Sequence, residues 1–571
     1  MAAFDISVRD TLKLLDGPFE TFAAGVSNGL YAFWLGSGIS FGRAPSLRIL
    51  VGKVVEFVRS RIDHEDPNCK FARTLREILS LAGASADERA RSKFDEPFAS
   101  WPDQDAMAWR LVNNYSKLLG LTVDGEDMDY LLWTVIDVGA TFADASMTPD
   151  VEHLCLAALS LEGTTPEMLS ANWDPLIERA VDILTGGNAA LSPTVVARPA
   201  DLQLPRNKTR LIKFHGCAVK AQGDPGQYRQ WLVASSDQVA AFNTQANNQG
   251  LVTALTHIVG SKRTLMLGLS AQDANIQGIF NKAANELTWQ LGNSPPSYVF
   301  SEQELGMDQR SLLKNVYRDQ ITPANLTSVY EAGRIQAYAK RLLLALLLDV
   351  WSRKLKALIP LAPGALPLAE RQHLCTGIVS LRNHLADAAE PELHFIDALL
   401  DRFGRASKLL RDGQIEQPNV RFEPISGDAV TALTGNPALG ALGLREAAVA
   451  LGLVGMGLSR SHWVVEAESL DRASGVLAVT GKGAAAARTK VYLTASASGA
   501  ALLRSEGHLV ETESPLLIQS QKLAVPMSRS PRGATGRTGL PKAREVSIST
   551  LLQTYATADQ LYEAFRQELA L

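Results

Sequence analysis

The sequence predicts an α/β protein in which a parallel sheet carries a helical insertion and is followed by a helical region and then a β-rich region. Three observations support this prediction. From about residue 29 to 300, short apolar runs closed by small or polar residues alternate with stretches of helical spacing. The first two of these runs are separated by a helical stretch much longer than an ordinary crossover. From about residue 461 onward, apolar and polar residues alternate as they do in strands.

Six apolar runs are candidate strands of the first sheet. Five of them end next to a glycine or polar residue, and in open α/β sheets ligands bind at the carboxyl ends of the strands. We therefore expect a Rossmann-like sheet with a ligand site at that edge. The six runs are residues 30–35, 168–171, 210–214, 231–234, 264–267 and 297–300.

The remaining elements define three expected regions. The sheet domain covers residues 1–310 and includes a helical insertion at about 47–161. A helical region follows at 311–460; its stretch 328–358 is predicted as one long amphipathic helix or two, and 368–412 continues the helical spacing. The β-rich region, 461–571, ends in a helix from about residue 556.

Composition excludes several classes of protein. The 56 basic and 60 acidic residues give a formal charge of −4, so the whole chain has no electrostatic attraction to nucleic acid or anionic membranes. The four cysteines are far apart and form no CxxC pair, which excludes a disulfide scaffold and a cysteine-rich zinc module and indicates a reducing compartment. The amino terminus lacks a secretory signal, and the most apolar stretches are shorter than the about 20 residues that cross a bilayer. We expect a cytoplasmic protein.

The first candidate motif is Gly36-Ser37-Gly38-Ile39-Ser40, directly after an apolar strand. Its glycines allow the backbone to approach a phosphate closely, and its hydroxyls and amide N–H groups can bind phosphate oxygens at a helix start. Taken alone, the motif fits a purely structural strand-to-helix turn equally well.

The second motif is Asn172-Trp173-Asp174, again after a candidate strand. At a strand end, Asn172 can bind a carboxamide or position a water molecule, and Asp174 can accept an N–H. In isolation, an Asn/Asp turn at a helix start explains the motif better.

The third motif is His215-Gly216, after the strand at 210–214. Of the nine histidines, His215 alone sits where a strand end meets a glycine, a place from which an imidazole base can face a cleft. A single histidine is more often structural than catalytic.

The fourth motif is Gly268-Leu269-Ser270 with Asp273 and Asn275, at the end of a further strand. Small residues there would leave room for an adenosine group, and the polar residues could meet its ribose hydroxyls. The alternative is an ordinary strand-to-helix turn.

The order and spacing of these motifs resemble the sirtuin-like NAD-binding family. Residues 36–40 with 45–48 (Pro-Ser-Leu-Arg) are similar to the family's Gly-Ala-Gly-Ile-Ser and Pro-Asp-Phe-Arg elements. Residues 172–178 resemble its Asn-Ile-Asp-x-Leu-x-Glu element, 215–216 its catalytic His-Gly, and 268–270 its late Gly-x-Ser. The sequence departs from the family at Ser37, Ala171 and Ser46, and in a shorter loop between Ser40 and Pro45.

Several features look closer to the prokaryotic defence branch of the family than to protein deacylases. Trp173 is the aromatic residue common after the Asn in that branch, and Gly268, Ser270 and Asp273 match its Gly-x-Ser-x-x-Asp element. Deacylating sirtuins usually carry a four-cysteine zinc ribbon, which this chain cannot build. The resemblance implies an NAD hydrolase that releases nicotinamide and ADP-ribose, with NAD as substrate and no metal. The alternatives are a catalytically silent NAD or ADP-ribose sensor and a zinc-free protein deacylase.

The resemblance also implies a role for each site residue. NAD cleavage needs no strong general acid, because nicotinamide leaves as a neutral base. Asn172 would position water or ribose hydroxyls, and His215 would act as the base. The expected cofactor-binding residues are Asp174 at the carboxamide, Gly36, Ser37, Gly38 and Ser40 at the phosphates, and Gly268, Ser270 and Asp273 on the adenosine side.

An enzyme that consumes NAD must be controlled, so we expect regulation; the resemblance to the defence branch implies a triggered effector of antiviral defence that acts by abortive infection. Its control would come from homo-oligomerisation or from an operon-encoded partner such as a short Argonaute or a HerA-type translocase. Segment 528–544 carries five basic residues and no acid among glycines and prolines. It is either a solvated loop or a basic arm that contacts nucleic acid or an acidic partner.

Overall fold

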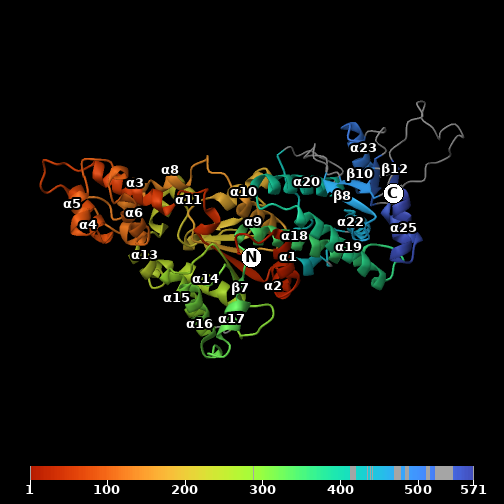
Figure 1. Cartoon of the computed structure of the whole chain (residues 1–571), viewed down its shortest axis with the longest axis horizontal. Helices are drawn as coiled ribbons and strands as arrows, with labels where there is room; N and C mark the ends of the chain where they lie inside the picture. Colours follow the sequence, from red (N-terminus) through yellow and green to blue (C-terminus); the bar gives the residue numbers. More distant parts are fainter. Residues whose placement is uncertain are drawn as a thin grey trace.

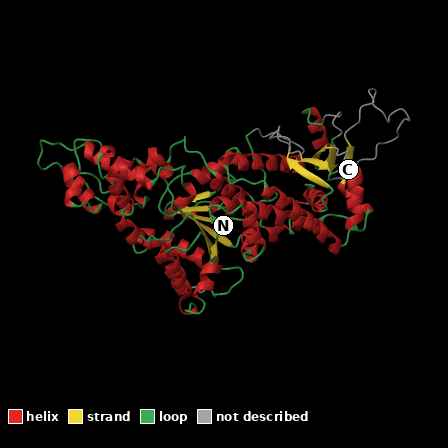
Figure 2. Cartoon of the chain, viewed as in Figure 1, coloured by secondary structure: helices red, strands yellow, loops and turns green. Residues whose placement is uncertain are grey.

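A seven-stranded parallel sheet forms the centre of the chain, as the sequence predicts (Figures 1 and 2). The computed structural model describes residues 2–286, 289–411, 419–433, 435–436, 439, 442–467, 477–482, 488–509, 515–520 and 544–569. The strand order is β3-β4-β2-β1-β5-β6-β7. The strands β2, β3 and β4 therefore lie on one side of β1, and β5, β6 and β7 lie on the other. The strands are β1 Tyr31–Leu35, β2 Glu167–Ser170, β3 Thr194–Val196, β4 Arg210–Lys213, β5 Arg263–Leu267, β6 Tyr298–Ser301 and β7 Arg334–Ile335.

Both faces of this sheet are buried, because side chains alternate between two cores along each strand. On β1, Tyr31, Phe33 and Leu35 pack into the core that contains the helices α1, α2, α9, α10 and α18. Ala32 and Trp34 point to the opposite core, which α14, α15 and α16 cover. The covering helices are α1 Val8–Asp16, α2 Glu20–Ser27, α9 Val151–Leu161, α10 Leu176–Thr185, α14 Gln249–Ser261, α15 Ala274–Glu286, α16 Met307–Tyr317, α17 Leu326–Ala332 and α18 Ala339–Leu358.

The predicted strand at 231–234 is wrong. A 3-10 turn covers Arg229–Trp231, and Leu232 and Ala234 pack into the core of the insertion instead of the sheet. The short helices of this segment are α11 Ala218–Gly223, α12 Pro225–Tyr228 and α13 Ser236–Ala241. An apolar run of four residues does not show which core its side chains enter, and here the tertiary contacts decide.

The residues between α3 and α8 build a separate helical unit with its own apolar core, which lies at one end of the molecule in Figure 1. Arg229 fixes this unit to the sheet domain, since its guanidinium donates to Asp129 (2.5 and 2.8 Å) and Asp127 (2.8 Å). The elements are α3 Leu47–Ser60, α4 Lys70–Leu81, α5 Ala86–Arg91, α6 Gln104–Val112, α7 Tyr115–Leu119, a π-helical turn Leu131–Ile136 and α8 Val138–Phe142.

A mostly helical region and a second sheet follow α18 and extend to the other end of the molecule (Figure 1). The second sheet has the order β12-β11-β10-β9-β8; β10, β11 and β12 are parallel, whereas β8, β9 and β10 pair antiparallel. Among the described helices, none is long and apolar enough to cross a membrane. The elements are α19 Leu368–Asp387, α20 Leu393–Arg411, α21 Val430–Leu433, α22 Leu444–Ser459, β8 Trp463–Ala467, β9 Leu477–Gly481, β10 Arg488–Thr494, α23 Ala497–Ser505, β11 Leu516–Gln519, β12 Arg544–Ser547, α24 Ile548–Thr554 and α25 Ala558–Leu569.

The basic segment predicted at 528–544 lies outside the described residues, apart from Arg544. Arg544 begins β12 and donates to the carbonyl of Glu568 (2.6 Å).

Candidate functional site

Four neighbouring strands end together at one edge of the sheet. The pairing of β4 with β2, β2 with β1 and β1 with β5 is parallel and in register up to the last residue of each strand. Adjacent strands lie about 4.8 Å apart, so the residues just beyond them form one row. The order of the strands reverses around β1, which is where open α/β sheets bind their ligands. This row contains the four predicted motifs, at Gly36, Asn172, His215 and Gly268.

The glycines of the first and fourth motifs pack directly against one another. The N–H of Gly38 donates to the carbonyl of Gly268 (3.1 Å). A Cβ on Gly36 would lie 2.7 Å from the Cα of Leu269, and a Cβ on Gly38 would lie 2.7 Å from the Cα of Gly268. Gly268 also has a φ of +60°, which favours glycine. Backbone packing between the two loops therefore requires these glycines, and Ser37 remains exposed beside them.

Asn172 ties the second motif to the first. Its Nδ2 donates to the carbonyl of Gly36 (3.1 Å) and to the hydroxyl of Ser40 (3.3 Å). The hydroxyl of Ser170 accepts its backbone N–H (3.0 Å). Asn172 and Ser40 are both buried, so their side chains are held in one orientation.

His153, on α9, completes this chain of hydrogen bonds. Its Nδ1 accepts the N–H of Asp150 (3.1 Å) in a capping box, and its Nε2 lies 3.3 Å from the hydroxyl of Ser40. Burial lowers the pKa of His153 to about 4, so the ring is neutral near pH 7. With Nδ1 accepting, the proton is on Nε2 and is donated to Ser40. Ser40 then accepts two hydrogen bonds, and its own O–H is not used in either of them.

His215 is held by Asn275 at the start of α15. Asn275 Oδ1 accepts the N–H of Ile276 (2.9 Å), so its Nδ2 faces His215 Nε2, 2.8 Å away, and can only donate. This network assigns the proton of the neutral ring to Nδ1. Burial lowers the pKa of His215 to about 4, and the imidazole is uncharged near neutral pH.

A buried lysine joins the loops of the second and third motifs. Lys213, the last residue of β4, is 1% exposed; its Nζ donates to the carbonyl of Asp174 (2.5 Å) and to Glu178 (2.7 Å). Burial acts to lower the pKa of Lys213, but the carboxylate of Glu178 and other nearby groups raise it, so the ammonium stays charged. The indole of Trp173 donates to the carbonyl of His215 (2.8 Å) and so joins the same two loops.

Asp174 is buried, and its Oδ1 accepts the N–H of Leu176 at the start of α10 (3.2 Å). The predicted role of its carboxylate, holding the carboxamide of NAD, remains a prediction. Ser270 is exposed, whereas Asp273 is half-buried at the start of α15 and burial raises its pKa.

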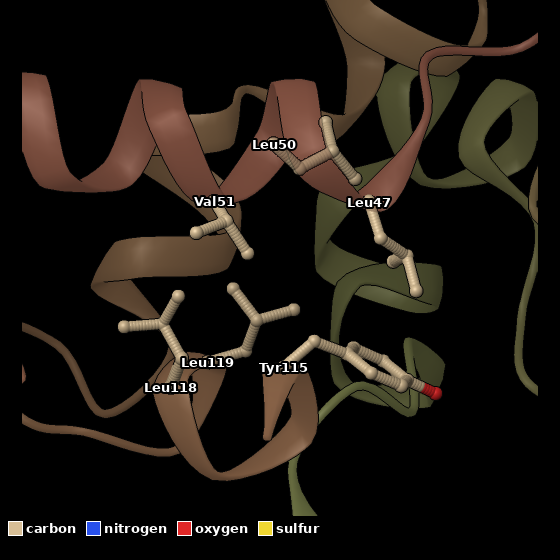
Figure 3. Close-up of a pocket in the computed structure, with 6 residues that line it drawn as sticks. All are labelled: Leu47, Leu50, Val51, Tyr115, Leu118 and Leu119. Atoms are coloured by element: carbon tan, nitrogen blue, oxygen red, sulfur yellow. The ribbon is translucent and has the colours of Figure 1, made fainter. Parts of the chain in front are cut away.

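Tyr115 begins α7 of the helical insertion. Burial, followed by the charge of Asp273, raises the pKa of Tyr115 to about 12. The ring of Tyr115 also borders a small apolar pocket between α3 and α7, which Figure 3 shows. In that view the side chains of the two helices converge, and the hydroxyl of Tyr115 points out of the pocket. The pocket is lined by Leu47, Leu50, Val51, Tyr115, Leu118 and Leu119.

Sequence reasoning missed His153. It carries no local signal beyond its place three residues after a candidate helix cap. Within the described ranges, no group of three or more His, Cys, Asp or Glu residues is placed to hold a metal ion.

One comparison with known protein families finds a match that covers part of this site. The model of the SIR2-like domain family matches residues 166–320, a segment that contains Asn172, His215 and Gly268. No curated protein matches the chain. The matched segment begins just before β2 and ends after α16, and the Gly36–Ser40 loop, which precedes it in the chain, packs against it in space. The chain therefore contains a sirtuin-like domain.

Proposed function

We propose that this protein binds NAD at the carboxyl edge of the sheet and hydrolyses the bond between nicotinamide and ribose. The observation that carries this proposal is the chain of hydrogen bonds from His153 through Ser40 to Asn172, next to His215 on the adjacent strand end. A SIR2-like domain suggests NAD-dependent activity in general. Binding alone does not require a buried amide and a buried imidazole at neighbouring strand ends.

The proposed reaction adds water to the ribose carbon as the bond to nicotinamide breaks. Nicotinamide leaves as a neutral base and takes the bonding electrons, the water oxygen bonds to the ribose carbon, and one proton is released. Asn172 would orient that water or a ribose hydroxyl through its fixed amide, and the O–H of Ser40 would supply a further donor. Such orientation lowers the barrier because it removes the entropy cost of bringing the groups together.

His215 would accept the proton. Its low pKa keeps it unprotonated near neutral pH, as a base must be. Its Nε2 lone pair, however, accepts a hydrogen bond from Asn275. Proton transfer to Nε2 therefore requires the amide of Asn275 to turn away when the substrate is in place.

The occupied lone pair of His215 favours one second candidate, an NAD or ADP-ribose sensor without turnover. In a sensor, the bond from Asn275 would persist and His215 would only shape the pocket. The two functions differ in one observable, because an enzyme releases nicotinamide in proportion to time and a sensor binds without releasing it.

We further propose that the activity is triggered and serves antiviral defence in the cytoplasm, since unregulated NAD hydrolysis would drain the cell. The residues beyond the sheet domain would bind further copies of the chain or an operon-encoded partner, such as a short Argonaute or a HerA-type translocase. A partner or trigger that raises turnover would support this part of the proposal.

The experiment that tests the proposed reaction is incubation of the full chain with NAD, with and without candidate partners, followed by chromatography of nicotinamide and ADP-ribose. Asn172→Ala and His215→Ala should each lower the rate about 10²- to 10³-fold. His257→Ala, at an exposed histidine on α14, is the matched control and should retain wild-type turnover. NAD binding without product in every condition would replace the hydrolase with the sensor.

A further inference from the structure

Lys340 links the region that follows the sheet to the NAD site. It is the second residue of α18, and it lies outside the segment 166–320 that matches the SIR2-like domain. Its Nζ donates to the carboxylate of Asp150 at a distance of 2.9 Å. Asp150 is the N-cap residue of α9, and α9 and α18 pack side by side (Figure 1). The two residues are 190 positions apart in the sequence.

The carboxylate of Asp150 is shared by three donors. Lys340 and Arg43 both reach its Oδ2, at 2.9 and 3.2 Å, and the N–H of Val151 donates to its Oδ1 (2.8 Å). The side chain of Asp150 is 9% exposed, whereas those of Lys340 and Arg43 are 36% and 29% exposed. The charge of this nearly buried carboxylate is therefore balanced by two partly exposed cations.

Two members of this cluster, Arg43 and Asp150, are connected by hydrogen bonds to Ser40 in the loop of the first motif. Arg43 follows Ser40 by three residues, and its backbone N–H donates to the carbonyl of Ser40 (3.0 Å). The backbone N–H of Asp150 donates to His153, which in turn donates to the hydroxyl of Ser40. Displacing Asp150 would thus weaken two contacts of Ser40, the one with the backbone of Arg43 and the one with His153.

The local charge balance shows why Lys340 matters. Burial acts to raise the pKa of Asp150, but the bonds from Arg43 and Lys340 lower it to about 2. A second buried acid, Glu152, lies close enough to interact electrostatically with both cations, and its Oε2 is buried without a hydrogen-bond partner. Without Lys340, Arg43 alone would balance two neighbouring carboxyl groups.

We propose that Lys340 is a positioning residue of the NAD site, contributed by the region beyond the sheet, which fixes Asp150 and through it the loop 36–46. This inference rests on the proposed function for its effect on NAD. It gives the carboxyl-terminal region a direct connection to the loop that would hold the NAD phosphates, because any movement of α18 changes the support of Asp150.

The test compares Lys340→Met with Lys340→Arg and with a matched control, Lys70→Met. Lys70 is 35% exposed and pairs with Glu126 in the helical insertion, so its replacement breaks a similar ion pair at another place. Hydrogen exchange of peptides that cover residues 36–46 is measured without NAD, and NAD affinity and steady-state kinetics are measured on the same proteins. Asp150→Asn, which keeps an acceptor for the N–H of Val151, tests the same link without touching α18.

We expect Lys340→Met to speed exchange in 36–46 and to raise the KM for NAD about tenfold with little change in kcat, the effect of one lost charge-assisted contact. Lys340→Arg should restore both, because a guanidinium can also donate to Asp150. The Lys70 variant should behave as wild type. Asp150→Asn should reproduce the faster exchange, including in the event that Lys340→Met does not fold.

Wild-type exchange in 36–46 for both Lys340→Met and Asp150→Asn would overturn the inference. So would faster exchange spread evenly over the whole chain, since that reports general destabilisation. Failure of the wild-type protein to bind or cleave NAD, together with faster exchange in 36–46 for Lys340→Met, would overturn the proposed function and leave the link from α18 to the loop standing.

Discussion

Replacing Lys354 by methionine should destabilise the protein more than most single substitutions, because it leaves a buried charge without its partner. Lys354 on α18 and Glu162 at the end of α9 are both fully buried, and their charged atoms lie 2.6 Å apart. Lys354 also donates to the carbonyls of Glu162 (2.7 Å) and Ser426 (2.6 Å). The pair therefore joins the sheet domain to two parts of the following region.

The expected cost follows from what remains around Glu162. In Lys354→Met, its carboxylate keeps two neutral donors, the indole of Trp351 (2.9 Å) and the N–H of Ile425 (3.1 Å), but no cation. Breaking a buried ion pair in this way costs about 3 to 5 kcal/mol. That is a large share of the roughly 5 to 15 kcal/mol by which folded proteins are stable. For cooperative unfolding of all 571 residues, the midpoint of thermal unfolding should fall by about 3 to 4 °C.

Urea and thermal unfolding of Lys354→Met, Glu162→Gln and the double variant measure this coupling. The amide oxygen that Glu162→Gln introduces can still accept from Trp351 and Ile425, so the double variant should recover at least half of the lost free energy of unfolding. The reasoning is refuted if Lys354→Met stays within about 1 kcal/mol of wild type, or if the double variant is no more stable than Lys354→Met.

Three further predictions concern the site and its surroundings. Burial raises the pKa of Glu152 from 4.5 to about 7, so its contribution to stability is fully present below pH 4.5 and is lost as the pH rises through 7. Glu152→Gln should thus raise the free energy of unfolding by about 3 kcal/mol above pH 7 and by little below pH 4.5, as measured by urea titration at both pH values. Gly36→Ala should cost about 3 kcal/mol or more, because its Cβ would meet backbone 2.7 Å away, whereas Gly52→Ala, in open space on α3, should be neutral or slightly stabilising in the same melting assay. His153→Ala should lower kcat/KM for NAD about tenfold through Ser40, and unchanged kinetics in this variant would remove His153 from the site.

The strands of the first sheet are predictable from the sequence where they contain at least four residues, because an apolar run of that length can be recognised. The runs near β1, β2, β4, β5 and β6 all form strands, within one or two residues of the expected bounds. The two missed strands, β3 and β7, have three and two residues, and so short a strand leaves no periodic pattern. The prediction at residues 231–234 is wrong because an apolar run does not distinguish the sheet from the core of the insertion.

The candidate site is predictable only in part, for a related reason. Asn172 and His215 stand at strand ends, and the order of strands in a parallel sheet brings such positions together. His153 and Lys340 have no comparable position in the sequence. His153 acts through Ser40, 113 residues away, and Lys340 through Asp150, 190 residues away. Only the packing of α9 against α18 and against the Ser37–Ser40 turn brings these pairs into contact.

The position of α18 late in the sequence determines when, during synthesis, the site can form. Its leucines, from Leu342 to Leu348, are buried in the same core as the inner face of β1 and the helix α9. The chain leaves the ribosome from its amino terminus, so every motif residue up to Asp273 is made before this helix exists. Until residue 358 has emerged, the core beneath the site lacks one wall, Glu162 lacks Lys354, and Asp150 has Arg43 but not Lys340 as its cation. A chain that consumes NAD would therefore complete its site only after synthesis has passed well into the region that we expect to control it.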